Sequence, residues 1–113
     1  MMDAISWDFF EERIATMVLL EAVPLPRAIG VLCRAYPDIS ADVLLLATIS
    51  FATHLDTTSG HIENKALVQS HRRYRIIAAL AADVALLAPG ERTCRALGTF
   101  WATSHNDIFG TRG

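Results

Sequence analysis

The stretch IENKALVQSHRRYRIIAALAADVALLA, residues 62–88, decides the fold of this chain. It contains neither glycine nor proline, and most of its residues favour a helix. At about 1.5 Å of rise per residue, a helix over the whole stretch would be roughly 40 Å long. A domain of this size has a radius of gyration of about 13 Å, so this helix would span the molecule. The rest of the chain must therefore be arranged around it.

The two halves of the stretch differ in character. One predicted seam steps by three and four residues and comprises Leu67, Ser70, Tyr74, Ile77, Ala78, Ala81, Val84, Ala85 and Ala88. The opposite side carries Lys65, Gln69 and Arg72 in the first half. In the second half it carries Ile76, Leu80, Asp83 and Leu87, and Asp83 is the sole polar residue from 76 to 88. A helix that is apolar all round has to be covered all round, so the second half is expected to be buried.

A second apolar element, residues 43–55, contains no charged residue. It is shorter than the roughly 20 residues needed to cross a bilayer, so we interpret it as a core helix. Two such helices exceed what a few short helices can cover, which favours a homodimer with a two-fold interface. We expect the oligomer interface to use Ile76, Leu80, Asp83 and Leu87. The alternative is that the two helices pack antiparallel within one monomer and shield each other.

Helix-capping residues and prolines delimit three further helices. The first is expected to begin near Ser6, a good N-cap, and to stop before Pro24. The others are expected over residues 27–36 and 91–104, and the tail 106–113 is expected to fray. The sequence thus predicts an all-α fold, a single irregular bundle of about five helices, with residues 1–113 forming one domain.

Composition bounds the class of protein. Hydrophobic residues make up 52% of the chain and charged residues 19%, which indicates a packed core rather than disorder. The net charge of −2 provides no overall attraction to nucleic acid or anionic lipid. The acidic N-terminal stretch does not resemble a signal peptide, which favours a cytoplasmic protein. Cys33 and Cys94 lie within apolar helical patterns, where thiols are usually inert packing.

The densest polar cluster lies at residues 71–75. We predict that His71, Arg72, Arg73 and Arg75 form a basic ridge that binds a partner, with Tyr74 turned inward. The alternative is a solvated basic face that pairs with nearby carboxylates. A similar question surrounds Asp83, because a carboxylate in an apolar half-helix needs a partner. Either an arginine pairs with it or its carboxylate reaches water at the edge of the bundle.

DNA binding is the competing hypothesis. The short turn between helices 27–36 and 43–55 suggests a helix-turn-helix, but the second helix offers no Lys, Arg, Asn or Gln to reach base edges. A DNA-binding regulator would have to use the first half of helix 62–88. Glu63 and the acidic net charge count against this reading.

Catalytic and metal sites have little support in the sequence. His54-x-Asp56 and His61-x-Glu63 flank one loop and offer metal-ligand chemistry, but loops ordinarily collect polar residues, so we predict no metal. No G-x-S-x-G, glycine-rich phosphate loop or H-E-x-x-H is present, and we predict neither a catalytic residue nor a cofactor. The expectation is a small, non-enzymatic, cytoplasmic interaction or regulatory protein. Its expected partners are a second copy of itself and an unidentified protein, and not a membrane.

Overall fold

The computed structural model describes residues 7–58, 64–103 and 109, and for residues 56–58 and 64–71 it describes the backbone alone. Within these ranges the chain is all-helical, as predicted. The elements are α1 (Trp7–Ala15), a π-helical turn η1 (Thr16–Leu20), α2 (Leu25–Ala35), α3 (Ala41–Thr58), α4 (Asn64–Ala85) and α5 (Cys94–Thr103). None of the helices described is both long and apolar enough to cross a membrane.

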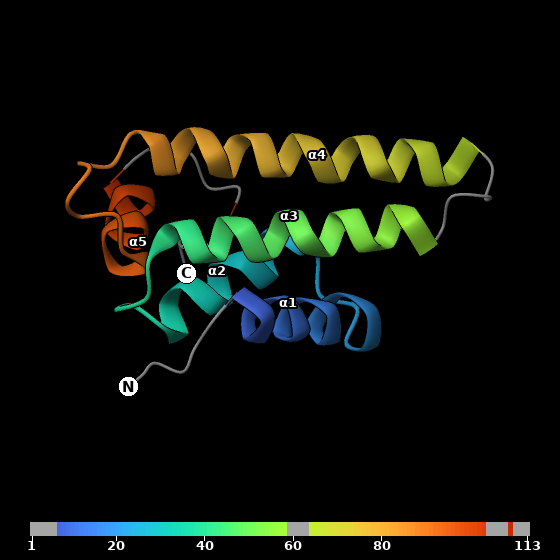
Figure 1. Ribbon diagram of the computed structural model, residues 1–113, viewed down its shortest axis with the longest axis horizontal. Coiled ribbons are helices and arrows are strands. Elements are labelled where there is room, and N and C mark those ends of the chain that lie inside the picture. Colours follow the sequence, from blue (N-terminus) through green and yellow to red (C-terminus); the bar gives the residue numbers. More distant parts are fainter. Residues whose placement is uncertain (1–6, 59–63, 104–108, 110–113) are drawn as a thin grey trace.

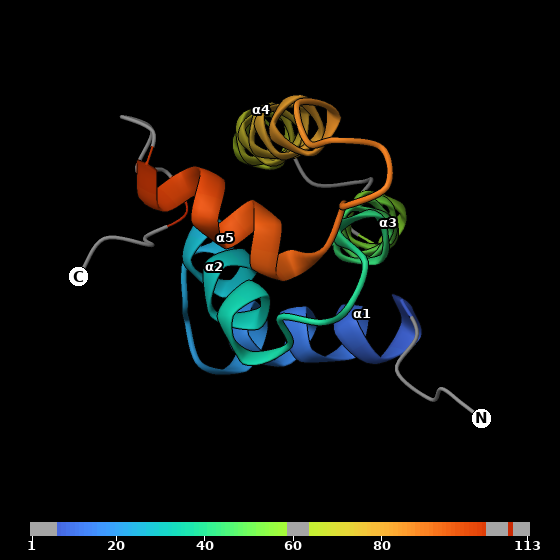
Figure 2. The same cartoon turned by 90° about the vertical axis from the view of Figure 1, so that its left-hand side faces the viewer.

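The two long helices, α3 and α4, lie side by side and antiparallel (Figure 1). This is the arrangement that the sequence left open as the alternative to a dimer. The short helix α1 packs along another side of α3, and α5 runs between α4 and α2 (Figure 2). With 22 residues, α4 is about 33 Å long and spans most of the 42 Å length of the molecule.

The helices begin where local chemistry favours it. The Ser40 hydroxyl accepts the backbone N–H of Asp42 at 3.1 Å and caps α3, and Thr93 does the same for Ala96 at the start of α5. Pro26 lies in the first turn of α2, where a missing N–H costs little. These signals are local, which is why the sequence located the helices to within a few residues.

The end of the first helix differs from the prediction. The α-helix stops at Ala15 and widens into η1, where Glu21 N–H bonds to Thr16 O at 3.1 Å and Val23 N–H to Met17 O at 2.9 Å. Ala22 then adopts a left-handed backbone with φ of 56°. Residues other than glycine rarely adopt this backbone conformation, so the packing around the turn before Pro24 must hold it in place.

The inward face of α4 matches the predicted seam only in part. Ile77 and Val84 of the seam are buried, whereas Tyr74 is 41% exposed and Ala78 is exposed. Tyr74 was therefore wrongly expected to turn inward. Leu80 and Asp83, expected on the opposite side, are buried as well, and burying leucine removes more apolar area from water than burying alanine.

Phe109 corrects the prediction of a frayed tail. Its side chain is 1% exposed and stacks on Trp101 with ring centroids 4.5 Å apart. Its backbone carbonyl lies against Gly30 of α2, which is why a residue without a Cβ stands there. The other residues of the tail lie outside the described part of the chain.

The α3–α4 hairpin is preceded by residues 37–40 and followed by residues 92–95, and these two segments are hydrogen-bonded to each other. The backbone N–H groups of Ala41, Cys94 and Arg95 donate to Arg92, Ile39 and Pro37 at 2.8, 2.7 and 2.8 Å. The Arg95 guanidinium also pairs with Asp38 at 2.7 Å. We call this set of bonds the loop clamp, and it holds the start of α3 beside the start of α5.

Candidate functional site

The predicted basic ridge is divided by the fold. Arg72 and Arg75 are exposed and Arg73 is half-buried, and the side chain of His71 lies outside the description. Arg72 and Arg73 line a hollow in the surface, and Arg75 does not. The ridge is therefore two arginines beside a concave surface together with one arginine that lies apart from it.

The hollow beside Arg72 and Arg73 has a volume of about 410 Å³ and an apolar floor. A second hollow of about 260 Å³ adjoins it and shares Leu19, Phe51 and Leu55. We name the two together the Leu19 groove. Its walls come from α1, η1, α2, α3 and α4, and its lining is Glu11, Ala15, Val18, Leu19, Leu25, Phe51, His54, Leu55, Arg72, Arg73 and Ile76.

The groove carries opposite charges at its two hollows. Beyond the apolar floor, Glu11 of α1 accepts a hydrogen bond from Ser50 Oγ at 2.8 Å and pairs through its other oxygen with Nδ1 of His54. The Glu11 side chain is only 15% exposed, and these two partners satisfy both of its oxygens. The order of these groups is Ser50, Glu11 and His54, with the carboxylate in the middle, and it differs from the serine–histidine–aspartate order of a hydrolase triad.

The rim of the groove is the strained turn after α1. Leu19 is 57% exposed and Leu20 is 81% exposed, both within η1. π-helical turns and left-handed non-glycine residues are concentrated at functional sites. The turn therefore presents two leucines to solvent next to two arginines.

The metal hypothesis concerned four residues, and only His54 has a described side chain. Its Nδ1 faces Glu11. The side chain of Asp56, and the whole of His61 and Glu63, lie outside the description, so the prediction of no metal stays a prediction. Among the side chains that are described, no three His, Cys, Asp or Glu residues gather around one point.

The predicted oligomer interface needs a correction at two of its four residues. Leu80 is fully buried and Asp83 is 7% exposed within the single chain, so neither presents a surface to a partner. The indole Nε1–H of Trp101 donates to Oδ2 of Asp83 at 2.8 Å. The partner of this carboxylate is therefore an indole of the same chain, which neither expected reading named. Ile76 and Leu87 are half-buried.

The exposed apolar side chains lie elsewhere on the hairpin. On α3, Leu46 is 53% exposed and Ile49 is 38% exposed, and beyond the end of α4 Leu86 is 70% exposed. Leu46 and Ile49 share a stripe with Asp42 and Thr53, which are also exposed. Part of the apolar surface of the two long helices is thus exposed in the single chain, and two of these side chains belong to α3.

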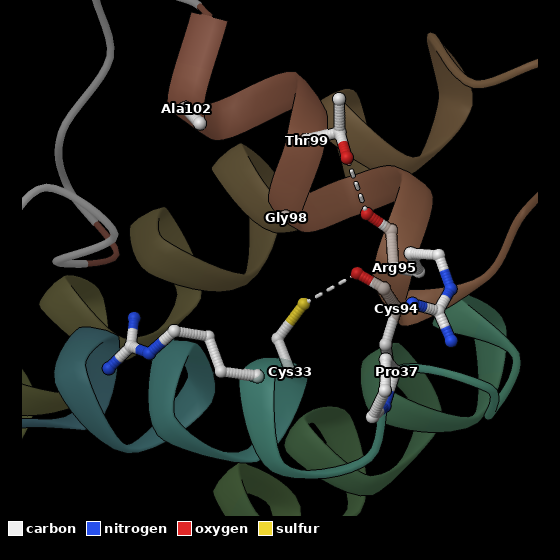
Figure 3. Close-up of a pocket in the computed structure, with 8 residues that line it drawn as sticks. Cys33, Pro37, Cys94, Arg95, Gly98, Thr99 and Ala102 are labelled. Carbon is white, nitrogen blue, oxygen red and sulfur yellow. Dashed lines mark hydrogen bonds between the residues drawn. The ribbon is translucent and has the colours of Figure 1, made fainter.

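One further group of residues was not predicted from the sequence. Cys33 of α2 and Cys94, the first residue of α5, are brought together although 61 residues separate them, and both are buried (Figure 3). Cys33 Sγ donates to the backbone carbonyl of Cys94 at 3.0 Å. Both thiols border a cavity of about 350 Å³, to which Arg34 and Arg95 also contribute. The one available signal was the repeated Cys-Arg pair, residues 33–34 and 94–95.

The chain was compared with known proteins. No protein-family model, no curated protein and no solved structure matches it.

Proposed function

We propose that this chain is a non-enzymatic interaction protein whose Leu19 groove binds an acidic amphipathic helix of a partner protein. The observation that carries the proposal is the apolar floor flanked by Arg72 and Arg73. Grooves of this kind bind the apolar face of a helix through residues spaced three, four and seven apart.

The shape of the groove suits such a ligand. Its two adjoining hollows share Leu19, Phe51 and Leu55, so they offer consecutive positions for apolar anchors. Leu19 is more than half exposed, and covering it with a partner's side chains would remove apolar area from water. The fixed turn of η1 keeps this wall in place before binding, which lowers the ordering cost of association.

The positive charge beside the groove favours an acidic partner. The guanidinium groups of Arg72 and Arg73 suit carboxylates, which they can bind in a bidentate manner. Glu11, at the other hollow, already has two partners, so its charge is partly compensated. A helix with acidic residues toward α4 would therefore be preferred over a basic one.

DNA binding remains the competing proposal. It requires arginines that project from a convex surface toward phosphates and base edges. Here Arg73 is half-buried and both arginines flank a concave apolar surface, which suits a protein helix better.

The test uses two fluorescent helical peptides with leucines at helical spacing, one with glutamates and one with lysines at the remaining positions. We expect the glutamate peptide alone to bind. The pair Arg72→Glu and Arg73→Glu should weaken this binding more than tenfold, since each charge-assisted bond contributes about 1.5–3 kcal/mol. Arg75→Glu is the matched control, because it makes the same charge change on the same helix outside the groove.

Three outcomes would contradict the proposal. The first is equal binding of both peptides, and the second is an equal loss with Arg75→Glu. The third is a steep salt dependence of binding to random duplex DNA that disappears with the Arg72/Arg73 pair, which would establish the DNA-binding alternative.

A homodimer is the second part of the proposal, now placed on α3. Leu46 and Ile49 form an exposed apolar pair between Asp42 and Thr53 on a regular helix, and two-fold helix packing could cover them. Light scattering coupled to gel filtration should give twice the chain mass, and Leu46→Glu should give the monomer mass. A monomer at tens of micromolar in the unchanged protein would refute this part alone.

We also propose that the protein resides in the cytoplasm. Two neighbouring free thiols suit a reducing compartment.

A further inference from the structure

The Cys33 and Cys94 thiols are placed as a pair. Cys33 Sγ lies 3.0 Å from the Cys94 carbonyl oxygen, so the two residues are in direct contact although they belong to different helices. One thiol comes from α2 and the other from α5, and the loop clamp fixes the backbone N–H of Cys94 to Ile39. The packing of these two helices therefore determines the distance between the sulfurs.

A cavity gives small molecules a route toward the pair. It has a volume of about 350 Å³, and Figure 3 shows Gly98, Thr99 and Ala102 of α5 on its border. A Cβ added to Gly98 would lie 4.0 Å from Cys33 Sγ, in ordinary contact, so the absence of a side chain there leaves one side of Cys33 open to the cavity. Both thiols are otherwise buried, which excludes large reagents from the folded protein.

The two thiols are not equivalent. The Cys33 side chain lowers the pKa of Cys94, and burial opposes this effect. Cys94 is also the first residue of α5, where the helix dipole favours a thiolate. The pKa of Cys33 is raised, first by the Cys94 side chain and then by burial. Cys94 is thus the nucleophile of the pair, and Cys33 is the thiol that stays protonated.

We propose that Cys33 and Cys94 form a modification site at which a small hydroperoxide oxidises the two thiols to a reversible disulfide. The Cys94 thiolate attacks the outer oxygen of the hydroperoxide, the O–O bond breaks, and the departing alkoxide or hydroxide takes a proton. Cys94 is then a sulfenic acid. Cys33 attacks its sulfur, the S–S bond forms, and the hydroxyl group leaves as water with the proton of Cys33. The two sulfurs lose two electrons in total, and the peroxide bond gains them.

This site lies between α2 and α5 and shares no lining residue with the Leu19 groove. Its failure in an experiment would leave the proposed function unaffected, and the converse also holds.

The experiment treats the full chain with hydrogen peroxide and measures intact mass without reductant. We expect the loss of two hydrogen atoms, protection of both cysteines from alkylation after unfolding, and full reversal by dithiothreitol. Cys33→Ser should instead accumulate a sulfenic acid at Cys94 that dimedone traps. Cys94→Ser should give no dimedone adduct at Cys33 under the same conditions.

Gly98→Ala tests the route through the cavity. The added methyl group would occupy the open side of Cys33, so we expect oxidation to slow several-fold while the fold is retained. Thr103→Ala, on the same helix and outside the cavity lining, is the matched control and should oxidise at the rate of the unchanged protein.

Two results would overturn the proposal. One is a folded protein whose thiols survive peroxide that oxidises the urea-unfolded chain, which would make the pair inert packing. The other is the addition of oxygen atoms to either cysteine with no loss of hydrogen, which would show that the sulfurs cannot join in the native geometry.

Discussion

Substitution of Gly30 by alanine tests how the tail is held. Gly30 is buried in α2, and a Cβ there would overlap the carbonyl oxygen of Phe109 and lie 3.1 Å from its carbonyl carbon. The backbone of α2 is fixed by its helical hydrogen bonds, so Phe109 has to move. Its ring would then lose its place on Trp101.

The magnitude follows from what Phe109 contributes. Removing a buried phenylalanine from a core costs about 3–5 kcal/mol. Alanine in place of glycine inside a helix raises the free energy of unfolding by about 0.5–1 kcal/mol. We therefore expect Gly30→Ala to lower the free energy of unfolding by about 2–4 kcal/mol. A domain of ordinary stability stays folded after such a loss.

Urea denaturation of a double-mutant cycle gives the measurement. In a Phe109→Ala background the ring is already gone, so Gly30→Ala should be neutral or stabilise by up to about 1 kcal/mol. Gly98→Ala is the control for helix propensity, because its Cβ meets no clash, and it should stabilise by about 0.5–1 kcal/mol. An equal loss from Gly30→Ala in both backgrounds would show that Phe109 is not what the methyl group displaces.

The remaining predictions concern the buried polar pair and the titration of the thiols. Asp83→Ala removes the acceptor of the Trp101 indole N–H and should cost about 1–3 kcal/mol in urea denaturation, whereas Asp83→Asn, which keeps an oxygen, should cost less. Equal losses for the two variants would show that the hydrogen bond is not responsible. Thiolate absorbance should show one thiol titrating with a midpoint below the ordinary value of 9.0, and Cys94→Ala should abolish this transition. Because the Cys33 side chain causes the lowered pKa of Cys94, Cys33→Ala should move the midpoint upward, and an unchanged midpoint would contradict this cause.

The helices were predictable because their signals are local. Pro26, Pro37 and the Ser40 cap act within one turn, so the sequence alone predicts the neighbouring helix ends to within a few residues. The start of α5 at Cys94, which Thr93 caps, lies three residues after the predicted one. The widening of α1 at Thr16 and the left-handed Ala22 carry no such signal, because packing around them imposes the conformation. The groove wall they build was therefore not foreseen.

The prediction of the inward face of α4 was only partly right, for a different reason. From residue 76 to 88 nearly every side chain is apolar, so periodicity does not distinguish one side from another. The neighbours decide, and the indole of Trp101 draws Asp83 inward together with Leu80. The same orientation of α4 about its axis decides which of the basic residues flank the Leu19 groove, so the sequence pattern alone does not predict it.

The thiol pair could not be derived from the sequence at all. Its two members are 61 residues apart, and each suits an apolar helix face. Only the path of the chain through the α3–α4 hairpin brings them together.

The loop clamp has a consequence for how the molecule can deform. Pro37 and Arg95 lie before and after the α3–α4 hairpin, and their backbones are hydrogen-bonded to each other, with 2.8 Å from Arg95 N to Pro37 O. Any movement of α3 and α4 relative to α2 and α5 is therefore restrained at this junction. We expect a ligand that pushes η1 away from α4 to strain the hydrogen bonds of the loop clamp, one of which is made by the backbone N–H of Cys94.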